Sequence, residues 1–345
     1  MIDLRSDTVT LPTNEMKKFI INSPLGDDVY GEDPSVNLLQ KKIAKIFNKE
    51  AALFVPSGTM ANLISVLTHC SRGDEVILGD KSHIFYYEAG GISAFGGIHS
   101  HQLKNDDDGT IKINDIENSI RDVGNDHFPQ TKLICLENTH NACYGSAIDS
   151  DYFSDVKEVA NKNNLLIHLD GARIFNAAIK LNKSVDELTK DCDTISCCLS
   201  KGLSAPVGSV ILGSKNFILK AKHIRKALGG GMRQAGLIAS AGIFSLDNMI
   251  NRVEDDHKNA TILAKQLSDI KNIKININQV HTNIIFIYNR HQNISDTKLL
   301  SKLEKENIKI DYKGNSKFRL VTHSGFKKSD IESVVKVFKE ILKDK

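Results

Sequence analysis

Lys201 is the residue of this sequence whose surroundings best suit covalent chemistry. It follows the apolar run 195–199 and precedes a series of small residues, so we expect it at a strand end that a ligand can approach closely. A lysine attacks an aldehyde only when neutral, and desolvation or cationic neighbours lower its pKa enough for that reaction. Because a lone lysine after a strand is usually a solvated loop residue, this prediction needs further support.

Asp170 supplies part of that support, because it ends a second apolar run, residues 165–170, one crossover unit upstream of Lys201. Open α/β sheets bind ligands at the carboxyl ends of their strands. A buried carboxylate there needs a cationic partner, and the protonated pyridine nitrogen of pyridoxal phosphate is such a partner. The alternative is that Asp170 caps a helix that begins within residues 171–173.

A candidate anion site lies at residues 57–59, where Ser-Gly-Thr joins the apolar run 51–55 to a helical pattern. The free backbone N–H groups and the dipole at a helix start attract anions, and Gly58 and Thr59 are small enough to admit a phosphate. The sequence contains neither a Walker motif nor GxGxxG, which disfavours the usual kinds of nucleotide binding.

An α/β domain with a mainly parallel sheet is the architecture that would bring these residues together. Helical patterns alternate with short apolar runs from about residue 35 to 230, as such domains require. We predict strands at 51–55, 75–78, 132–136, 165–170, 194–199 and 209–212. A second, smaller α+β domain is expected from residue 245, with strands at 283–288 and 317–322 and a final helix at 330–343.

The composition indicates a globular protein with neither nucleic-acid nor membrane partners. The 345 residues are 41% apolar and 25% charged, and the net charge of +3 arises without a basic block. The first ten residues lack a signal-peptide pattern, and no apolar run approaches the ~20 residues that span a bilayer. The six cysteines form no CxxC pair, so we predict buried reduced thiols in a cytoplasmic protein rather than disulfides or a metal site.

Several longer motifs resemble, in the same order, the threonine aldolase branch of the fold-type-I pyridoxal-phosphate enzymes. Besides the segments around Gly58, Asp170 and Lys201, they are residues 3–10 (DLRSDTVT), 27–34 (DDVYGEDP), 82–85 (SHIF), 88–91 (EAGG), 136–141 (LENTHN) and 317–322 (KFRLVT). The resemblance covers nearly the whole chain. It implies a large cofactor-binding domain at 31–244 with a mainly parallel seven-stranded sheet, a small α+β domain at 245–345, and an N-terminal arm at 1–30 that packs with the small domain.

The same resemblance implies a role for each candidate site residue. Lys201 would form the Schiff base, Asp170 would pair with the pyridine nitrogen, and His83 would stack on the cofactor ring. The residues that would hold the cofactor phosphate are Gly58, Thr59, Ser200 and Arg233, with Arg173 also beside the cofactor. The residues that would hold the substrate carboxylate are Ser6, Arg173 and Arg319, because guanidinium groups bind carboxylates bidentately. His83 and His127 are the candidates to meet the substrate β-hydroxyl, and no metal site is implied.

The implied reaction is cleavage of L-threonine or L-allo-threonine to glycine and acetaldehyde, through an external aldimine and a quinonoid carbanion. The implied assembly is a homodimer or homotetramer whose active sites lie at the dimer interface. One departure from the family pattern is Tyr144, where a glycine is common, and its ring is expected to narrow the pocket or shift its loop. Two alternatives stay open: a β-eliminating lyase or other small-amino-acid enzyme of the same fold, and a non-catalytic regulator that binds the cofactor.

Overall fold

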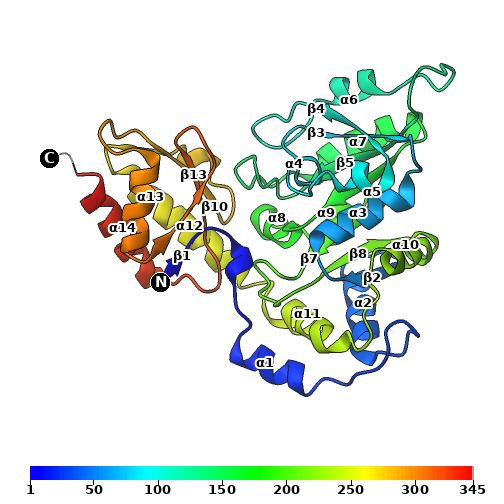
Figure 1. The fold of residues 1–345 in the computed structure, drawn as a ribbon, viewed down its shortest axis with the longest axis horizontal. Coiled ribbons are helices and arrows are strands. Elements are labelled where there is room, and N and C mark those ends of the chain that lie inside the picture. Colours follow the sequence, from blue (N-terminus) through cyan, green and yellow to red (C-terminus); the bar gives the residue numbers. More distant parts are fainter. Residues whose placement is uncertain (344–345) are drawn as a thin grey trace.

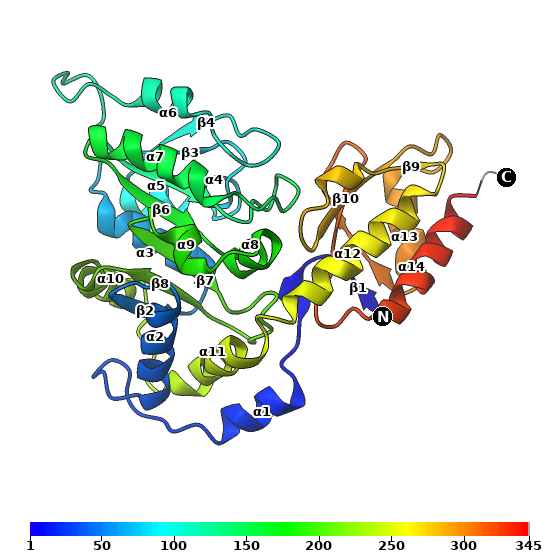
Figure 2. The ribbon, with the colours of Figure 1, turned by 180° about the vertical axis from the view of Figure 1, so that it is seen from behind.

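The computed structural model describes residues 1–343, which form a larger and a smaller lobe (Figures 1 and 2). The larger lobe is built on a seven-stranded sheet with the order β2-β8-β7-β6-β5-β3-β4. Its strands are β2 (Ala51–Val55), β3 (Glu75–Gly79), β4 (His99–Leu103), β5 (Thr131–Glu137), β6 (Leu166–Asp170), β7 (Thr194–Cys198) and β8 (Ser209–Gly213). Six of them, β2, β3, β4, β5, β6 and β7, point in the same direction, whereas β8 is antiparallel to both of its neighbours, β2 and β7. The predicted mainly parallel sheet is therefore confirmed.

The edge strand β4 is missing from the predicted set of strands. Its sequence, His-Ser-His-Gln-Leu, carries one apolar residue, and all five positions are partly or fully exposed. An edge strand that packs little of its surface lacks the apolar run by which buried strands are recognised.

Helices cover both faces of the large sheet, which explains the continuous apolar runs of its central strands. The helices of this lobe are α1 (Asn14–Ile21), α2 (Pro34–Ile46), α3 (Gly58–His69), α4 (His83–Tyr86), α5 (Gly91–Gly96), α6 (Ile113–Ser119), α7 (Ser150–Lys162), α8 (Ile174–Leu181), α9 (Val185–Thr189), α10 (Lys215–Ala227) and α11 (Gly236–Asn248). Val76 of β3 packs with Leu63 of α3 on one face. Ile77 belongs to the core on the other face, which includes Phe153 of α7, and Figure 2 shows α7 on that side.

The smaller lobe is the α+β unit that the sequence predicts after residue 245. A four-stranded antiparallel sheet has the order β12-β13-β10-β9. The elements are α12 (Val253–Ser268), β9 (Ile273–Lys274), β10 (Ile284–Asn289), α13 (Asp296–Lys305), β11 (Ile308–Lys309), β12 (Asp311–Tyr312), β13 (Lys317–Val321) and α14 (Lys328–Ile341). The apolar stripe of α14 is buried against this sheet and α12, and includes Ile331, Val334 and Phe338.

The N-terminal segment contacts both lobes. Its first strand, β1 (Ile2–Asp3), pairs in parallel with β11 of the smaller lobe. Farther along, α1 packs on α11 of the larger lobe. The domain boundary expected at residue 245 falls inside α11, which also packs on α2, so the exact division of the chain stays a prediction.

All six cysteines are buried and free, as the sequence predicts. Among the helices formed by residues 1–343, none has both the length and the apolar character needed to cross a membrane.

Candidate active site

The carboxyl ends of four strands bring the predicted site residues to one edge of the large sheet. Asp170 is the last residue of β6, Lys201 follows β7, Gly58 follows β2, and His83 follows β3. Parallel strands end at the same edge, and a ligand site is expected there in an open α/β sheet. The structure thus gathers residues that lie up to 143 positions apart in the sequence, from Gly58 to Lys201.

Asp170 is an ionised carboxylate at the bottom of this site, with 2% of its surface exposed. Its two oxygens accept hydrogen bonds from Asn62 Nδ2 at 2.8 Å and from the Ala172 backbone N–H at 3.0 Å. Burial raises the pKa of Asp170, but the positive charges of His83 and Lys201 and the hydrogen bond from Asn62 outweigh it and lower the pKa overall. The alternative role of Asp170 as a helix cap is only partly fulfilled. Asp170 accepts a hydrogen bond from the Ala172 backbone N–H, but the N-cap residue of α8 is Arg173.

His83 is linked to Asp170 through Glu88 and Asn62. Its Nδ1 lies 2.8 Å from Glu88 Oε1, and the same oxygen accepts a hydrogen bond from Asn62 Nδ2 at 2.8 Å. When Glu88 is ionised it only accepts hydrogen bonds, so Nδ1 carries the ring proton, and Nε2 has a free lone pair whenever the ring is neutral. Burial lowers the pKa of His83, but Glu88, Asp170 and Glu137 raise it further, so it lies above the ordinary value.

A chain of hydrogen bonds fixes the orientation of Asn62 from the side away from Asp170. Asn62 Oδ1 lies 3.1 Å from His168 Nε2, His168 Nδ1 lies 3.0 Å from Thr194 Oγ1, and that hydroxyl lies 3.0 Å from His69 Nε2. Burial lowers the pKa of His168 to about 3 and that of His69 to about 4, so both rings are neutral. The Asn62 amide nitrogen already donates to two carboxylates, so its oxygen must be the acceptor and His168 Nε2 the donor.

Arg173 is buried and paired with Asp7. Its Nε and Nη2 donate to the two Asp7 oxygens at 2.8 and 2.7 Å, and Asn283 Nδ2 lies 3.3 Å from the same carboxylate. Burial raises the pKa of Asp7, but Arg173 and Lys201 outweigh it and lower the pKa strongly overall. Two of the three Arg173 nitrogens therefore donate hydrogen bonds within the protein, and only Nη1 is left to bind a substrate.

Arg319 reaches the site from β13 of the smaller lobe. Its guanidinium donates to Asn141 Oδ1 at 2.6 Å and to the Arg5 carbonyl at 3.0 Å, and pairs with Asp311 at 3.0 Å. Its Nε is buried and has no hydrogen-bond partner within residues 1–343. Burial and the positive charge of Arg173 lower the pKa of Arg319. A buried, unpartnered donor beside a second cation suits an anionic ligand.

The candidate phosphate site at the start of α3 has open donors. Ser57 caps the helix by accepting from the Met60 N–H, whereas the N–H groups of Gly58 and Thr59 bond no atom of residues 1–343. A Cβ on Gly58 would lie 2.7 Å from Cys198 Sγ, so glycine lets α3 approach β7, the strand that leads to Ser200. Free N–H groups at a helix start beside a serine fit a bound phosphate.

Three other predicted residues are placed differently. Ser6 caps the short 3-10 helix Asp7–Val9 by accepting from the Thr8 N–H. Arg233 is exposed and contacts Asp27 and Tyr30 rather than the residues around Gly58. His127 is exposed in the loop that leads into β5, at the amino-terminal edge of the sheet, opposite His83. One chain therefore brings neither Arg233 nor His127 to this site, and their predicted roles would need a second copy.

Sequence reasoning missed Asp7, Asn62 and Glu88 as site residues, although all three lie inside the motifs that carry the family resemblance. Asn62 offered a signal, since it is a polar residue flanked by Ala61 and Leu63 in an apolar helix, and a buried amide needs partners. The ligand atoms of His83, Glu88 and Asp170 lie within 4.8 Å of one another, a spacing that a metal ion also accepts. In this structure the Asn62 side-chain amide donates one hydrogen bond to Glu88 and one to Asp170, so a neutral amide group links the two carboxylates.

Comparison with known proteins agrees with this geometry. Residues 3–290 match the model of the β-eliminating lyase family. The low-specificity L-threonine aldolase 1 of Arabidopsis thaliana is 46% identical, with 99% of this chain and 96% of that protein covered. The low specificity L-threonine aldolase of Escherichia coli is 40% identical over 97% of both chains. The solved structure of Leishmania major threonine aldolase, at 19% identity, shares the fold with a TM-score of 0.83 over 99% of this chain and 100% of that one. The chain therefore belongs to the β-eliminating lyase family, within its group of low-specificity L-threonine aldolases.

Proposed function

We propose that this protein is a pyridoxal-phosphate-dependent aldolase that cleaves L-threonine and L-allo-threonine to glycine and acetaldehyde. The observation that carries the proposal is the meeting of Lys201, the ionised Asp170 and the buried Arg319 around one sheet edge. An amine, a carboxylate and a guanidinium group are the groups that a cofactor aldehyde, a pyridinium nitrogen and a substrate carboxylate require.

The described residues fit the cofactor at each of its polar ends. Lys201 would attach the cofactor aldehyde, Asp170 would pair with the pyridine nitrogen, and His83 would lie against the ring. The open N–H groups of Gly58 and Thr59, with Ser200, would hold the phosphate. When bound, pyridoxal phosphate supplies the sink for the electron pair that is left at Cα when the Cα–Cβ bond breaks.

Arg319 would bind and orient the substrate carboxylate. Its free Nε and its position near Arg173 attract an anion, while Asn141 and Asp311 hold the guanidinium plane in place. Fixing the carboxylate sets the rotation about Cα, so that the Cα–Cβ bond takes the orientation needed for cleavage. Arg173 would contribute mainly through its positive charge near the substrate carboxylate, because two of its nitrogens already donate to Asp7.

His83 would accept the proton of the substrate β-hydroxyl. Glu88 fixes the proton of the ring on Nδ1, so the lone pair of Nε2 can take another proton. Loss of that hydroxyl proton lets the oxygen form a carbonyl as the Cα–Cβ bond breaks, which releases acetaldehyde. Cα then regains a proton to give glycine.

The Glu88→Gln variant is expected to move the acidic limb of the pH profile. His83 must be neutral to accept a proton, so kcat/KM falls as the pH drops through the raised pKa of His83. Glu88 is the largest of the influences that raise this pKa, and glutamine keeps a hydrogen-bond acceptor without the charge. We therefore expect the acidic limb of kcat/KM for L-threonine to shift to lower pH. An unmoved acidic limb would remove His83 from the role of base.

The proposed reaction is tested by incubating the purified holoenzyme with L-threonine and L-allo-threonine and measuring both acetaldehyde and pyruvate. Acetaldehyde together with an equal amount of glycine is the expected result. Pyruvate and ammonia from serine or cysteine, without acetaldehyde from threonine, would favour a β-eliminating lyase. A bound cofactor without turnover of any of these amino acids would favour a non-catalytic regulator.

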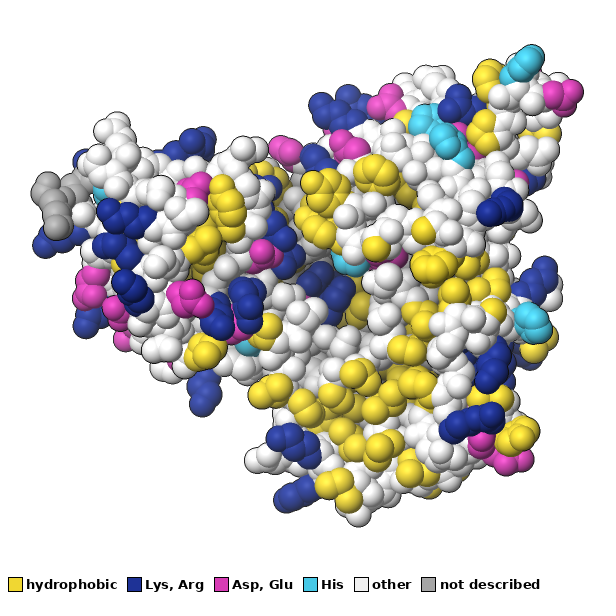
Figure 3. Space-filling model, viewed as in Figure 1, with side chains coloured by type: hydrophobic (Ala, Val, Ile, Leu, Met, Phe, Trp, Pro, Cys, Tyr) yellow, Lys and Arg dark blue, Asp and Glu magenta, His cyan; other side chains and the backbone are white. Residues whose placement is uncertain are grey.

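We also propose that the protein works as a homodimer or homotetramer with the active sites at the interface. Figure 3 shows hydrophobic side chains gathered over the lower part of the larger lobe. Exposed apolar residues of this region include Phe19 and Ile21 of α1, Leu38 of α2 and Leu237 of α11. An exposed apolar area of this kind supports association of two copies, which could bring His127, Tyr30 and Arg233 to a neighbouring site. The buried free thiols support the further proposal of a cytoplasmic location.

A further inference from the structure

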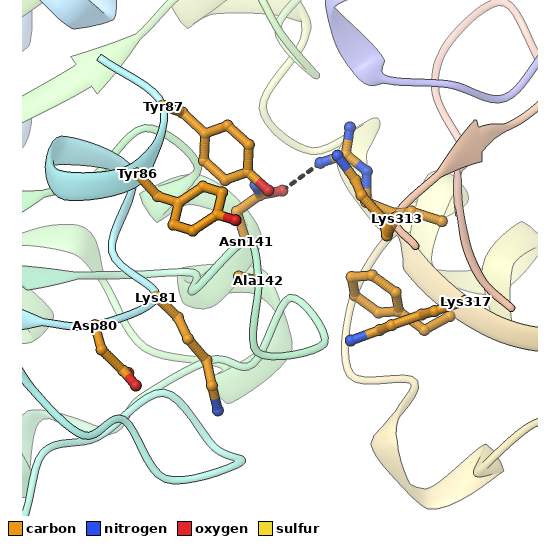
Figure 4. A pocket seen from close by; sticks show the side chains of 10 residues that line it. Asp80, Lys81, Tyr86, Tyr87, Asn141, Ala142, Lys313 and Lys317 are labelled. Carbon is orange, nitrogen blue, oxygen red and sulfur yellow. Dashed lines mark hydrogen bonds between the residues drawn. The ribbon is translucent and has the colours of Figure 1, made fainter. Parts of the chain in front are cut away.

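A pocket of about 210 Å³ lies beside Arg319, between the two lobes (Figure 4). The larger lobe contributes Lys81, Tyr86 and Tyr87 to its walls, and the smaller lobe contributes Phe286, Lys313, Lys317 and Arg319. Four of the residues that line it are cationic, and a single carboxylate, that of Asp80, opposes them. The pocket is therefore suited to an anionic group rather than to the methyl group of threonine alone.

Lys317 is the cation of this pocket whose ammonium forms neither an ion pair nor a hydrogen bond with residues 1–343. Its ammonium lies 4.1 Å from the centre of the Phe286 ring and 4.9 Å from that of Tyr144, and no carboxylate of residues 1–343 lies within ion-pairing distance. Lys313, in contrast, pairs with Asp311 at 2.8 Å, and Lys81 donates to the Asn105 carbonyl at 3.2 Å. Ring faces hold an ammonium group in place but use none of its strong hydrogen-bonding capacity, so Lys317 can still bind an anion.

Tyr144 supports Lys317 from behind the pocket. Its ring meets the Phe286 ring edge-on, with centres 5.2 Å apart, and its hydroxyl lies 3.2 Å from that of Tyr288. The backbone of Tyr144 has φ = +61°, a conformation that favours glycine and is strained for a residue with a side chain. The Tyr144 ring is not among the residues that line this pocket, and its expected effect on the shape of the substrate site stays a prediction.

Lys317 and Arg319 stand on the same face of β13. They are two residues apart, a separation of about 7 Å along a strand, and their partners on β10 are Tyr288 and Phe286. If Arg319 binds the α-carboxylate of a substrate, a second anionic group on the substituent at Cβ has Lys317 within its reach.

We propose that this pocket is a subsite for a carboxylate carried on the Cβ substituent, and that Lys317 is its specificity-determining residue. The substrate class is that of β-hydroxy-α-amino acids with an acidic group at the far end of the side chain. The proposal rests on the aldolase function proposed above. It adds that Tyr144, at a position where the family commonly has glycine, holds Lys317 in place for this purpose.

The test compares two substrates of nearly equal size, β-(4-carboxyphenyl)serine and its aryl methyl ester, by the release of the substituted benzaldehyde. We expect the wild-type holoenzyme to have the higher kcat/KM for the acid. Lys317→Met should lower the acid-to-ester ratio by about tenfold, as loss of one charge-assisted hydrogen bond does. Tyr144→Gly, whose backbone suits the positive φ, should lower the ratio in the same direction, whereas Tyr144→Phe should retain most of it.

Lys336→Met is the matched control, because Lys336 is an exposed lysine on α14, away from the pocket. It should leave the acid-to-ester ratio unchanged. A wild-type enzyme without preference for the acid, or a preference that survives Lys317→Met, would overturn the subsite while leaving the aldolase proposal intact. If none of the three compounds, the acid, the ester and L-threonine, releases an aldehyde, both proposals are overturned.

Discussion

Lys201→Ala is expected to abolish the aldolase activity. Removal of a residue that forms a covalent bond to its reaction partner typically costs on the order of 10⁴-fold or more in rate. The variant should also lack the absorbance at ~410–430 nm that a lysine-linked cofactor gives. Because Lys201 is only partly buried and lies outside β7, we expect the fold to be preserved.

Two measurements define the result for Lys201→Ala, namely kcat/KM for L-threonine and the visible spectrum after incubation with pyridoxal phosphate. Lys190→Ala is the matched control. Lys190 is an exposed lysine that precedes β7, whereas Lys201 follows the same strand. The control should keep both the activity and the absorbance band. Retention of the band in Lys201→Ala would assign the covalent link to another lysine.

Asp170→Asn is expected to have the second-largest effect. Asparagine has nearly the shape of aspartate and can still accept a hydrogen bond from Asn62, but it has no charge to pair with a protonated pyridine nitrogen. Breaking a buried charge pair costs about 3–5 kcal/mol, which corresponds to roughly 10²- to 5 × 10³-fold in kcat/KM. We also expect the variant to lose the cofactor more readily on dialysis.

Asp193→Asn provides the comparison for Asp170→Asn. Asp193 lies on the same sheet but at the opposite edge, where it pairs with Lys157 at 2.9 Å and its side chain is 29% exposed. Loss of this partly exposed pair is expected to change stability by no more than about 1 kcal/mol and to leave kcat/KM unchanged. Equal kinetic losses in the two variants would mean that Asp170 acts through stability and not through the cofactor.

The parts of the fold and site that follow from local patterns were predictable from the sequence. Lys201, Asp170 and Gly58 each follow or end an apolar strand, and the rule that parallel strands share an edge places them together. The apolar stripe of α14 and the continuous runs of β5 to β7 indicated the two lobes in the same way. The edge strand β4 was missed because its residues pack little.

Contacts between distant segments could not be predicted from local patterns. The pairing of Asp7 with Arg173 joins residues 166 positions apart, and nothing near either residue indicates its partner. Glu88 and Asn62 become site residues only when α3 and the loop after α4 pack together. His127 and Arg233, by contrast, were assigned by resemblance alone, and one chain places both of them elsewhere.

Mapping the lysine that carries the cofactor is the most direct test of the proposed active site. The wild-type holoenzyme is reduced with borohydride and digested, and the modified peptide is identified by mass spectrometry. We predict one modified residue, Lys201, in the peptide that follows the buried strand β7. Modification of a different lysine, or a cofactor that is released without any modified peptide, would contradict the assignment of Lys201 as the residue that binds the cofactor covalently.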